Sequence, residues 1–250
     1  MGRSLYRQTI LAIQFATVFP TPQLGDVTED EMRRSMAWLP VLGALLGALL
    51  WLLNLGLRKV LAPLPAAVVA IAFYTLCTGA LHLDGLLDTA DAVGSRAKGE
   101  RALAIMKDSR VGAMGVVAGC LVLLGKVAAL SALLPQSPEP FIVLPALSRM
   151  AMLWAMGWAP AARSEGLASL FARRLPVSVT WTGTLSVCGL SFWLLSWQEA
   201  LIVVLGVFAF SWGMTRWLQR RFGGLTGDSY GAINELIEWL GWTALSVHGW

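Results

Sequence analysis

Apolar residues run in long stretches along most of the chain, and polar residues gather in the segments between them. Because a helix needs about 20 apolar residues to cross a bilayer core, such stretches predict transmembrane helices. Seven qualify: 35–57, 60–81, 111–135, 141–162, 175–198, 200–215 and 229–250. The sixth is short, and the seventh contains Glu235 and Glu238. A six-span chain in which 229–250 lies flat on the membrane is therefore the alternative.

The composition points the same way. Of the 250 residues, 56% are apolar and 14% are charged, whereas soluble domains carry about 25% charged residues. This excludes most soluble folds. No repeat or Ser/Gly-rich linker divides the chain, so we expect one integral membrane domain over 1–250, an all-α polytopic helix bundle. The net charge of +4 comes without a basic stripe, so nucleic acid is not an expected partner.

Positive charges collect on one side of the predicted membrane. If the seven stretches alternate in direction, fifteen of the 19 Lys and Arg residues fall on the same side, in the N-terminal segment and the loops 82–110, 163–174 and 216–228. By the positive-inside rule this side is cytoplasmic. Two cations fall opposite, and Lys126 and Arg149 lie within spans.

The N-terminal segment resembles a signal peptide only at first sight. Arg3 and Arg7 precede an apolar run, but no small-residue cleavage site follows. We therefore expect a retained segment that is interfacial or partly inserted.

The densest acidic motif follows the second span and reads His82-Leu-Asp-Gly-Leu-Leu-Asp-Thr-Ala-Asp91. On a helix Asp84, Asp88 and Asp91 share one face, because positions i, i+4 and i+7 fall within about 60° of each other. Such a stripe could be a solvated polar face. It also suits a hard cation, because Mg²⁺ prefers carboxylate oxygens and bridges them to substrate phosphates.

A second motif, Met106-Lys-Asp-Ser-Arg-Val-Gly112, places a carboxylate between two cations at the start of the third span. Asp108 could complete the metal shell, while Lys107 and Arg110 could contact phosphate oxygens. The alternative is that these cations are an ordinary cytoplasmic anchor of the span.

The third motif covers 223–238 and combines a Gly-rich turn with carboxylates. Gly224 and Thr226 could bring backbone amides close to an anion. Asp228 and Glu235 are seven residues apart and so share a helix face, with Asn234 beside them. Carboxylates within a span cost about 2.5–3.5 kcal/mol each on insertion scales and normally face a polar cavity.

Two further charges, Lys126 and Arg149, lie within predicted spans. We expect them to pair with Glu235 or Glu238, although Arg149 is also a candidate substrate contact. His82 could orient a carboxylate of the aspartate stripe and contact substrate, but a lone His at a helix end is more often structural.

Taken together, these motifs resemble the cobalamin synthase family, the adenosylcobinamide-GDP ribazoletransferases of bacterial inner membranes. Similar residues extend along the chain: Phe19-Pro-Thr-Pro22, Lys126, Ser148-Arg149 and Glu165-Gly-Leu. The resemblance implies a Mg²⁺-dependent transfer that joins adenosylcobinamide-GDP to α-ribazole or its 5′-phosphate. The products would be adenosylcobalamin or its 5′-phosphate, together with GMP. It also implies a multi-pass inner-membrane protein whose active site faces the cytoplasm.

In this hypothesis the carboxylates Asp84, Asp88, Asp91 and Asp108 hold one or two Mg²⁺ ions on the pyrophosphate. Asp228 or Glu235 is the base that takes the proton of the attacking hydroxyl. The remaining candidate substrate contacts are His82, Lys107, Arg110, Gly224, Thr226, Asn234 and Arg149.

Two other functions remain open from the sequence. A CDP-alcohol phosphotransferase also uses a membrane aspartate motif, but the second half of that motif does not follow Asp84-Gly85-Leu-Leu-Asp88. A transporter would also place charges within spans, but nearer the midplane. Whether the chain is a monomer or a homo-oligomer is not decided by the sequence.

Overall fold

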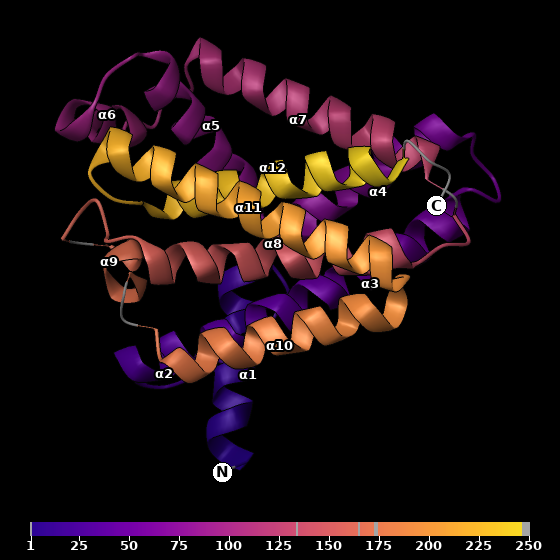
Figure 1. Ribbon diagram of the computed structural model, residues 1–250, viewed down its shortest axis with the longest axis horizontal. Coiled ribbons are helices and arrows are strands. Elements are labelled where there is room, and N and C mark those ends of the chain that lie inside the picture. Colours follow the sequence, from indigo (N-terminus) through magenta and orange to yellow (C-terminus); the bar gives the residue numbers. More distant parts are fainter. Residues whose placement is uncertain (1, 134, 165, 173–174, 247–250) are drawn as a thin grey trace.

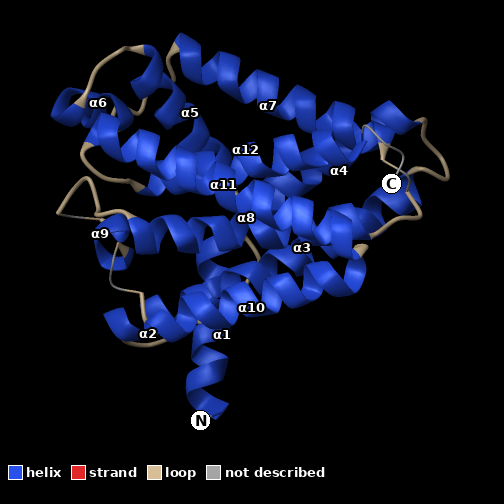
Figure 2. Ribbon diagram, in the orientation of Figure 1, coloured by secondary structure: helices blue, strands red, loops and turns tan. Residues whose placement is uncertain are grey.

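The structure is a computed structural model that describes residues 2–133, 135–164, 166–172 and 175–246. Its long helices lie side by side in one bundle (Figure 1). In the described part all regular elements are helices, apart from one isolated bridge between Ala161 and Leu225 (Figure 2). The predicted all-α membrane bundle is confirmed. Glu165, on which part of the family resemblance depends, lies outside the described residues.

Five of the predicted spans form helices that are long and apolar enough to cross a membrane. The first runs over Glu29–Leu57 and joins α2 (Glu29–Ser35), the short 3₁₀ helix η1 (Met36–Trp38) and α3 (Leu39–Leu57). The others are α7 (Ala113–Ala132), α8 (Glu139–Trp158), α10 (Val177–Leu194) and α11 (Trp197–Phe222). The predicted short span 200–215 thus belongs to a helix of 26 residues.

The predicted span 60–81 is wrong as a straight helix. α4 (Pro63–Cys77) has 15 residues, about 22 Å, which is less than the bilayer core of about 30 Å. After it Gly79 and Ala80 take left-handed φ angles of 58° and 57°, and α5 (Leu81–Gly94) leaves at 91° to α4. The pair makes a sixth crossing only if both helices are counted as one broken span. The aspartate motif forms α5 itself.

The last predicted span forms α12 (Gly227–Ser246), and residues 247–250 lie outside the described part. α12 is not among the helices that pass as membrane spans on length and composition. It lies in the centre of the bundle, in contact with α5, α7 and α8, and most of its residues from Ser229 to Glu238 are buried. Protein rather than lipid therefore surrounds Glu235 and Glu238.

α8 is the core of the bundle. In its most apolar stretch of 18 residues, 83% of the residues are buried inside the bundle. The corresponding share is 22% for α10 and for α11, which lie at the periphery. α3 packs on α8 through Gly43 and Gly47, where a Cβ would overlap the backbone carbonyl oxygens of Pro145 and Phe141. This is the small-residue packing that membrane helices use to approach closely.

The N-terminal segment forms α1 (Gly2–Ala16), whose first turns project from the bundle (Figure 1). Its later residues Leu11, Ala12 and Ala16 are buried, whereas Leu5 is exposed. Arg7 joins it to α2 through an ion pair of 2.6 Å with Glu31.

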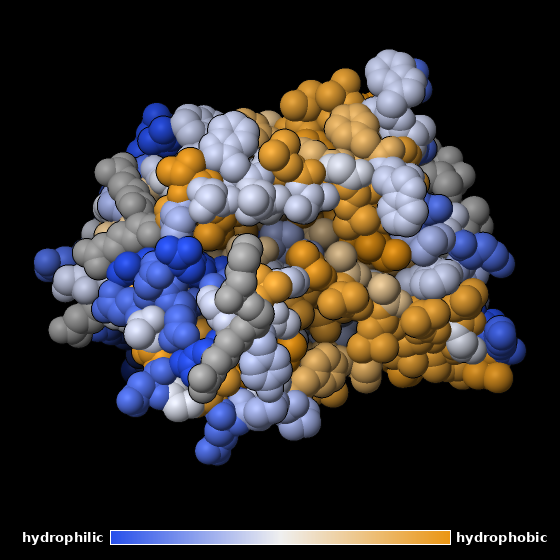
Figure 3. Space-filling view, turned by 90° about the horizontal axis from the view of Figure 1, so that it is seen from below, coloured by the Kyte–Doolittle hydropathy of each residue, from blue (hydrophilic) through white to orange (hydrophobic). Residues whose placement is uncertain are grey.

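Charged side chains gather at one end of the molecule. In Figure 3 most of the strongly hydrophilic residues lie toward the left, and apolar residues dominate the right apart from a few hydrophilic ones along its edge. The left end of Figure 1 carries α2, α6 (Gly99–Met106) and α9 (Leu167–Phe171). The exposed Lys98, Arg101, Lys107 and Arg110 follow α5 in the chain and belong to or flank α6. The arrangement agrees with the predicted concentration of cations on one face of the membrane.

Candidate active site

The first and third motifs meet where α5 crosses α12. A Cβ at Gly85 would lie 2.8 Å from Cα of Asp228, and a Cβ at Gly231 would lie 2.8 Å from the carbonyl oxygen of His82. Because these two glycines have no side chain, the backbones of α5 and α12 can approach each other closely. Asp84 and Asp88 come within electrostatic reach of Asp228, although 144 and 140 residues separate them from it along the chain.

Arg163 is the cation that acts on both Asp88 and Asp228, and it offsets part of the negative charge of the three carboxylates. It lies in the connection after α8, and its Nη2 donates to the carbonyl oxygen of Leu103 at 2.6 Å. Its buried Nε has no hydrogen-bond partner in the described protein. Arg163 was predicted only as one of the cations of the cytoplasmic loop 163–174, and its place beside the carboxylates was not.

Asp91 has a different environment from the other two aspartates of α5. Its carboxylate accepts hydrogen bonds from the backbone N–H groups of Gly112 at 2.6 Å and Gly115 at 2.7 Å. A Cβ at either glycine would overlap this carboxylate. Asp91 thus caps the N-terminus of α7, where amides lack helical partners and the helix dipole favours an anion. Its predicted role as a metal ligand stays a prediction.

We expect Asp91→Ala to destabilise the protein by about 1 kcal/mol, the usual effect of losing an N-cap acceptor. Asp84→Ala is the matched control, because Asp84 is exposed and no hydrogen bond from its side chain is found in the described residues. Thermal unfolding in detergent measures both. Equal melting temperatures for the two variants would contradict the capping role.

Asp108 lies in the exposed loop between α6 and α7. Its two carboxylate oxygens accept from Nε and Nη2 of Arg110 at 3.0 and 2.7 Å. These hydrogen bonds lower the pKa of Asp108 to about 2, so it is ionised at any physiological pH. Lys107 beside it is exposed. The structure brings this trio together on one loop, but it pairs Asp108 with Arg110 instead of with the aspartates of α5.

A cavity of about 180 Å³ opens at the crossing of α5 and α12. Its polar lining comes from His82, Asp84, Asp228 and Tyr230. Its apolar wall comes from other elements and includes Phe15, Met152, Met156 and Phe171. Tyr230 was missed by the sequence analysis although it lies within the third motif. The apolar wall could not be predicted from the sequence, because α1, α8 and α9 meet there only in the fold.

Several buried polar atoms around this crossing have no hydrogen-bond partner in the described protein. They are Nε2 of His82, the hydroxyls of Thr89 and Tyr230, and both amide atoms of Asn234. Burying such groups without partners is costly. Of these residues, His82 and Tyr230 line the cavity and are placed to meet a polar ligand there.

Contacts with other parts of the protein hold the Gly-rich turn in place. Gly223 has a φ of 83° and ends α11. A Cβ at Gly224 would lie 2.6 Å from the backbone of residues 161–162. The N–H of Leu225 donates to the carbonyl oxygen of Pro160, and its carbonyl oxygen accepts from the N–H of Ala162. Thr226 Oγ1 accepts from the N–H of Ser229 at 3.2 Å and so caps α12. Gly224 and Thr226 therefore have structural roles, and their contact with substrate stays a prediction.

The intramembrane charges form a buried network. Nζ of Lys126 lies 2.7 Å from Glu235 and 2.6 Å from Glu238. Arg149 pairs with Glu238, which also accepts from the hydroxyl of Tyr74 at 2.7 Å. The predicted pairing of the two cations with the glutamates is confirmed. Glu235 and Arg149, named also as catalytic and substrate-contacting candidates, are thus engaged with protein partners.

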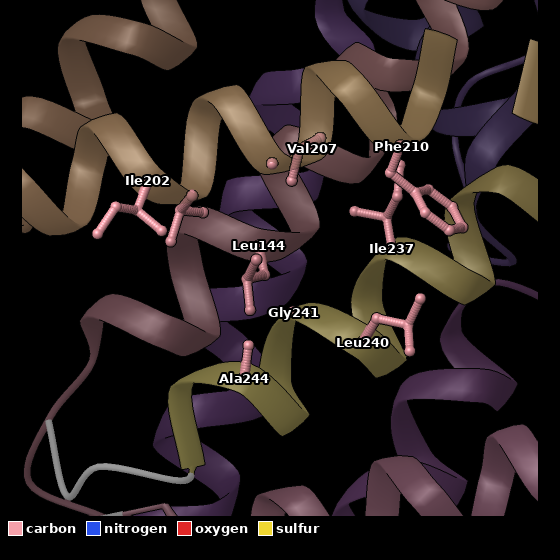
Figure 4. Close-up of a pocket in the computed structure, with 10 residues that line it drawn as sticks. Leu144, Ile202, Val207, Phe210, Ile237, Leu240, Gly241 and Ala244 are labelled. Atoms are coloured by element: carbon pink, nitrogen blue, oxygen red, sulfur yellow. The ribbon is translucent and has the colours of Figure 1, made fainter. Parts of the chain in front are cut away.

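An apolar cavity of about 270 Å³ lies between α8, α11 and α12 (Figure 4). Leu144, Val207 and Ile237 line it, and no charged side chain does. It offers nothing to a phosphate or a metal, so the candidate site is the cavity beside the aspartates.

The fold and this site define a class: an integral-membrane helical protein with a carboxylate-rich cavity at the polar end of its bundle. The family model for cobalamin-5-phosphate synthase matches residues 8–246. A Pseudomonas fluorescens protein named adenosylcobinamide-GDP ribazoletransferase is 37% identical over 230 residues, covering 91% of this chain and 94% of its own length. A protein of that name from Pseudomonas putida (strain W619) is 41% identical, covering 91% of this chain and 93% of its own length. Another from Desulfitobacterium hafniense is 37% identical, covering 94% of both chains. No solved structure matches the chain.

The chain belongs to the cobalamin-5-phosphate synthase family and is a transferase. The family resemblance predicted from the three motifs is confirmed. The comparisons favour neither a CDP-alcohol phosphotransferase nor a transporter.

Proposed function

We propose that this protein joins adenosylcobinamide-GDP to α-ribazole or α-ribazole 5′-phosphate, with Mg²⁺, and releases GMP. The products are adenosylcobalamin or its 5′-phosphate. Family membership and the names of the relatives support the substrates. The observation that carries the proposal is the crossing of α5 and α12, which places Asp84 and Asp228 in the wall of one cavity and Asp88 within electrostatic reach of both.

The donor set at the crossing fits Mg²⁺. Asp84 and Asp88 offer carboxylate oxygens, and Arg163 alone does not balance the charge of the three aspartates. In the described residues no three His, Cys, Asp or Glu side chains converge into a ready-made metal cage. Mg²⁺ typically needs no such cage, because one or two carboxylates and the substrate phosphates hold it. When bound, it would neutralise charge on the pyrophosphate and on the departing GMP.

We propose Asp84 and Asp88 as the principal metal ligands among the four predicted ones. Asp91 caps α7 and Asp108 pairs with Arg110, so both carboxylates already have partners in the protein. Asp91 then acts by fixing the start of α7 against α5, and the loop of Asp108 leads directly into that anchored end.

In our proposal the hydroxyl oxygen of ribazole bonds to the cobinamide-side phosphorus. Asp228 accepts the proton that this hydroxyl loses. The bond from this phosphorus to the bridging oxygen breaks, and GMP leaves with the electron pair. Asp228 suits this role better than Glu235 because it lines the cavity, whereas Glu235 is buried against Lys126. A positioned general base contributes about 10²–10⁴-fold to the rate.

Other residues of the site suit binding. Arg163, with its unpartnered Nε, is placed to contact a phosphate oxygen. Nε2 of His82 and the hydroxyl of Tyr230 can complete polar contacts to substrate. The apolar wall around Met152 and Phe171 would exclude water from the reacting groups. Lys107 and Arg110 stand on the exposed loop as further phosphate contacts.

We also propose that the site faces the cytoplasm of a bacterium, at the inner membrane. The gathering of cations at the polar end of the bundle supports this orientation through the positive-inside rule. The lipid bilayer is then a constant partner of the apolar helices.

A nucleotide-release assay on the purified full chain tests the function. With Mg²⁺ present, GMP is expected only when adenosylcobinamide-GDP and α-ribazole, or its phosphate, are supplied together. Release of GMP without the ribazole would instead indicate a hydrolase. Release of CMP from a CDP-alcohol, with no GMP in the complete reaction, would overturn the proposal.

A further inference from the structure

A second hollow lies on the surface of α11, at its C-terminal end. It measures about 540 Å³ and is lined by Trp212, Arg216, Gln219, Arg220 and Gly223. The neighbouring Arg221 faces elsewhere, because its Nη2 donates to the carbonyl oxygen of Val93 at the end of α5. The hollow therefore looks away from α5 and its aspartates.

Among the described residues, the two arginines in this hollow have no acidic partner. None of the close ion pairs among the described residues involves Arg216 or Arg220. Oε1 of Gln219 is buried without a hydrogen-bond partner. The guanidinium of Arg216 lies 4.1 Å from the ring centroid of Trp212 and is held in place by this cation–π contact. Two arginines, one of them fixed, suit a phosphate group.

An apolar groove of about 620 Å³ adjoins the hollow between α8, α10 and α11, which lie next to one another (Figure 1). Trp154, Trp158 and Phe208 form much of its wall. Of the three tryptophans that line it, Trp154 donates its indole N–H to the hydroxyl of Thr184 at 2.9 Å. The groove suits hydrocarbon.

Aromatic contacts connect the groove to the basic hollow. Trp158 packs edge-on against Phe208 at 5.3 Å and against Trp212 at 5.2 Å between ring centroids. Trp158 and Phe208 line the groove and Trp212 lines the hollow. The two concavities are thus neighbouring parts of one surface, apolar at one end and cationic at the other.

We propose that this surface binds an anionic phospholipid. Its phosphate would contact Arg216 and Arg220, and one acyl chain would lie in the groove along Trp158 and Phe208. A basic pocket at the end of apolar helices is a recognised setting for acidic lipids. A soluble phosphate compound would use the hollow but leave the groove empty, and a zwitterionic lipid would bring its own cation to the two arginines. The site is separate from the proposed catalytic cavity.

Native mass spectrometry of the delipidated full chain in detergent tests the proposal, with phosphatidylglycerol and phosphatidylcholine at equal concentrations. Phosphatidylglycerol should bind about 30-fold more tightly, the factor that two surface cations supply. Arg216→Gln with Arg220→Gln should remove this preference. Lys98→Gln with Arg101→Gln changes the charge equally at exposed residues of another helix and its flank, and should keep the preference.

A second pair of variants tests the groove. No atom lies within 4 Å of a Cβ added at Gly157, which lines the groove, or at Gly189, which does not. Gly157→Phe should therefore fill the groove without strain and weaken phosphatidylglycerol binding, whereas Gly189→Phe should leave it unchanged.

Equal binding of the two lipids by the unaltered protein would overturn the proposal. So would equal losses in the arginine and control variants. Inorganic phosphate is the remaining probe: if it displaces phosphatidylglycerol at concentrations near that of the lipid itself, the groove adds nothing and the occupant is a soluble phosphate. GMP release is expected to persist in the Gly157→Phe variant, which lies outside the catalytic cavity.

Discussion

Asp84→Asn is expected to reduce GMP release by about a hundredfold or more, because it removes one charged ligand of the proposed metal site while keeping the side-chain shape. Asp228→Asn should lower turnover by about 10²–10⁴-fold, the contribution of a positioned base. Steady-state GMP release over a range of Mg²⁺ concentrations separates the two roles. Additional Mg²⁺ should partly restore Asp84→Asn and should leave Asp228→Asn unchanged.

Glu100→Gln is the matched control for both variants, since it neutralises an exposed carboxylate on the neighbouring helix α6. Its GMP release should match that of the unaltered protein. Near-normal turnover of Asp84→Asn would remove Asp84 from the metal site. A full rate in Asp228→Asn would exclude it as the base and leave the metal proposal standing.

The second large effect is expected in the buried charge network. Lys126 and Arg149 balance Glu235 and Glu238, so the four charges sum to zero. Lys126→Met leaves a buried negative charge without compensation, which typically costs about 3–5 kcal/mol. We expect a correspondingly lower thermal unfolding midpoint in detergent.

Lys126→Met combined with Glu235→Gln provides the control, because it restores electrical balance and keeps the pair of Arg149 with Glu238. The double variant should therefore be more stable than Lys126→Met alone. If its destabilisation equals the sum of the two single effects, the charges do not act as a network and the interpretation is wrong.

Most of the bundle could be predicted from the sequence, because hydropathy and length together decide whether a helix can span a bilayer. The turn between α4 and α5 could not be predicted from the sequence. The stretch 60–81 is uniformly apolar, and nothing in hydropathy reports that Gly79 and Ala80 adopt left-handed φ angles. The pairing of Lys126 with the glutamates of α12 was predictable, because isolated charges at such depth are costly.

Many residues of the site could be predicted from the sequence, but their geometry could not. The spacing of Asp84, Asp88 and Asp91 indicated one helix face, but it could not show that Asp91 would cap α7. Gly85 and Gly231 stand within the motifs, yet their function is to let two backbones approach, which depends on a partner far away in the chain. Arg163 and Tyr230 carried no sequence signal that separated them from ordinary loop and core residues.

The buried network also bears on how the protein is made. α12 follows α7 and α8 in the chain, and its two glutamates would oppose its entry into lipid as an isolated segment. Their partners Lys126 and Arg149 belong to α7 and α8, which leave the ribosome earlier. α12 can therefore be accommodated only after those helices have assembled. Since α12 carries Asp228, the carboxylate cluster forms only once α12 has joined those earlier helices.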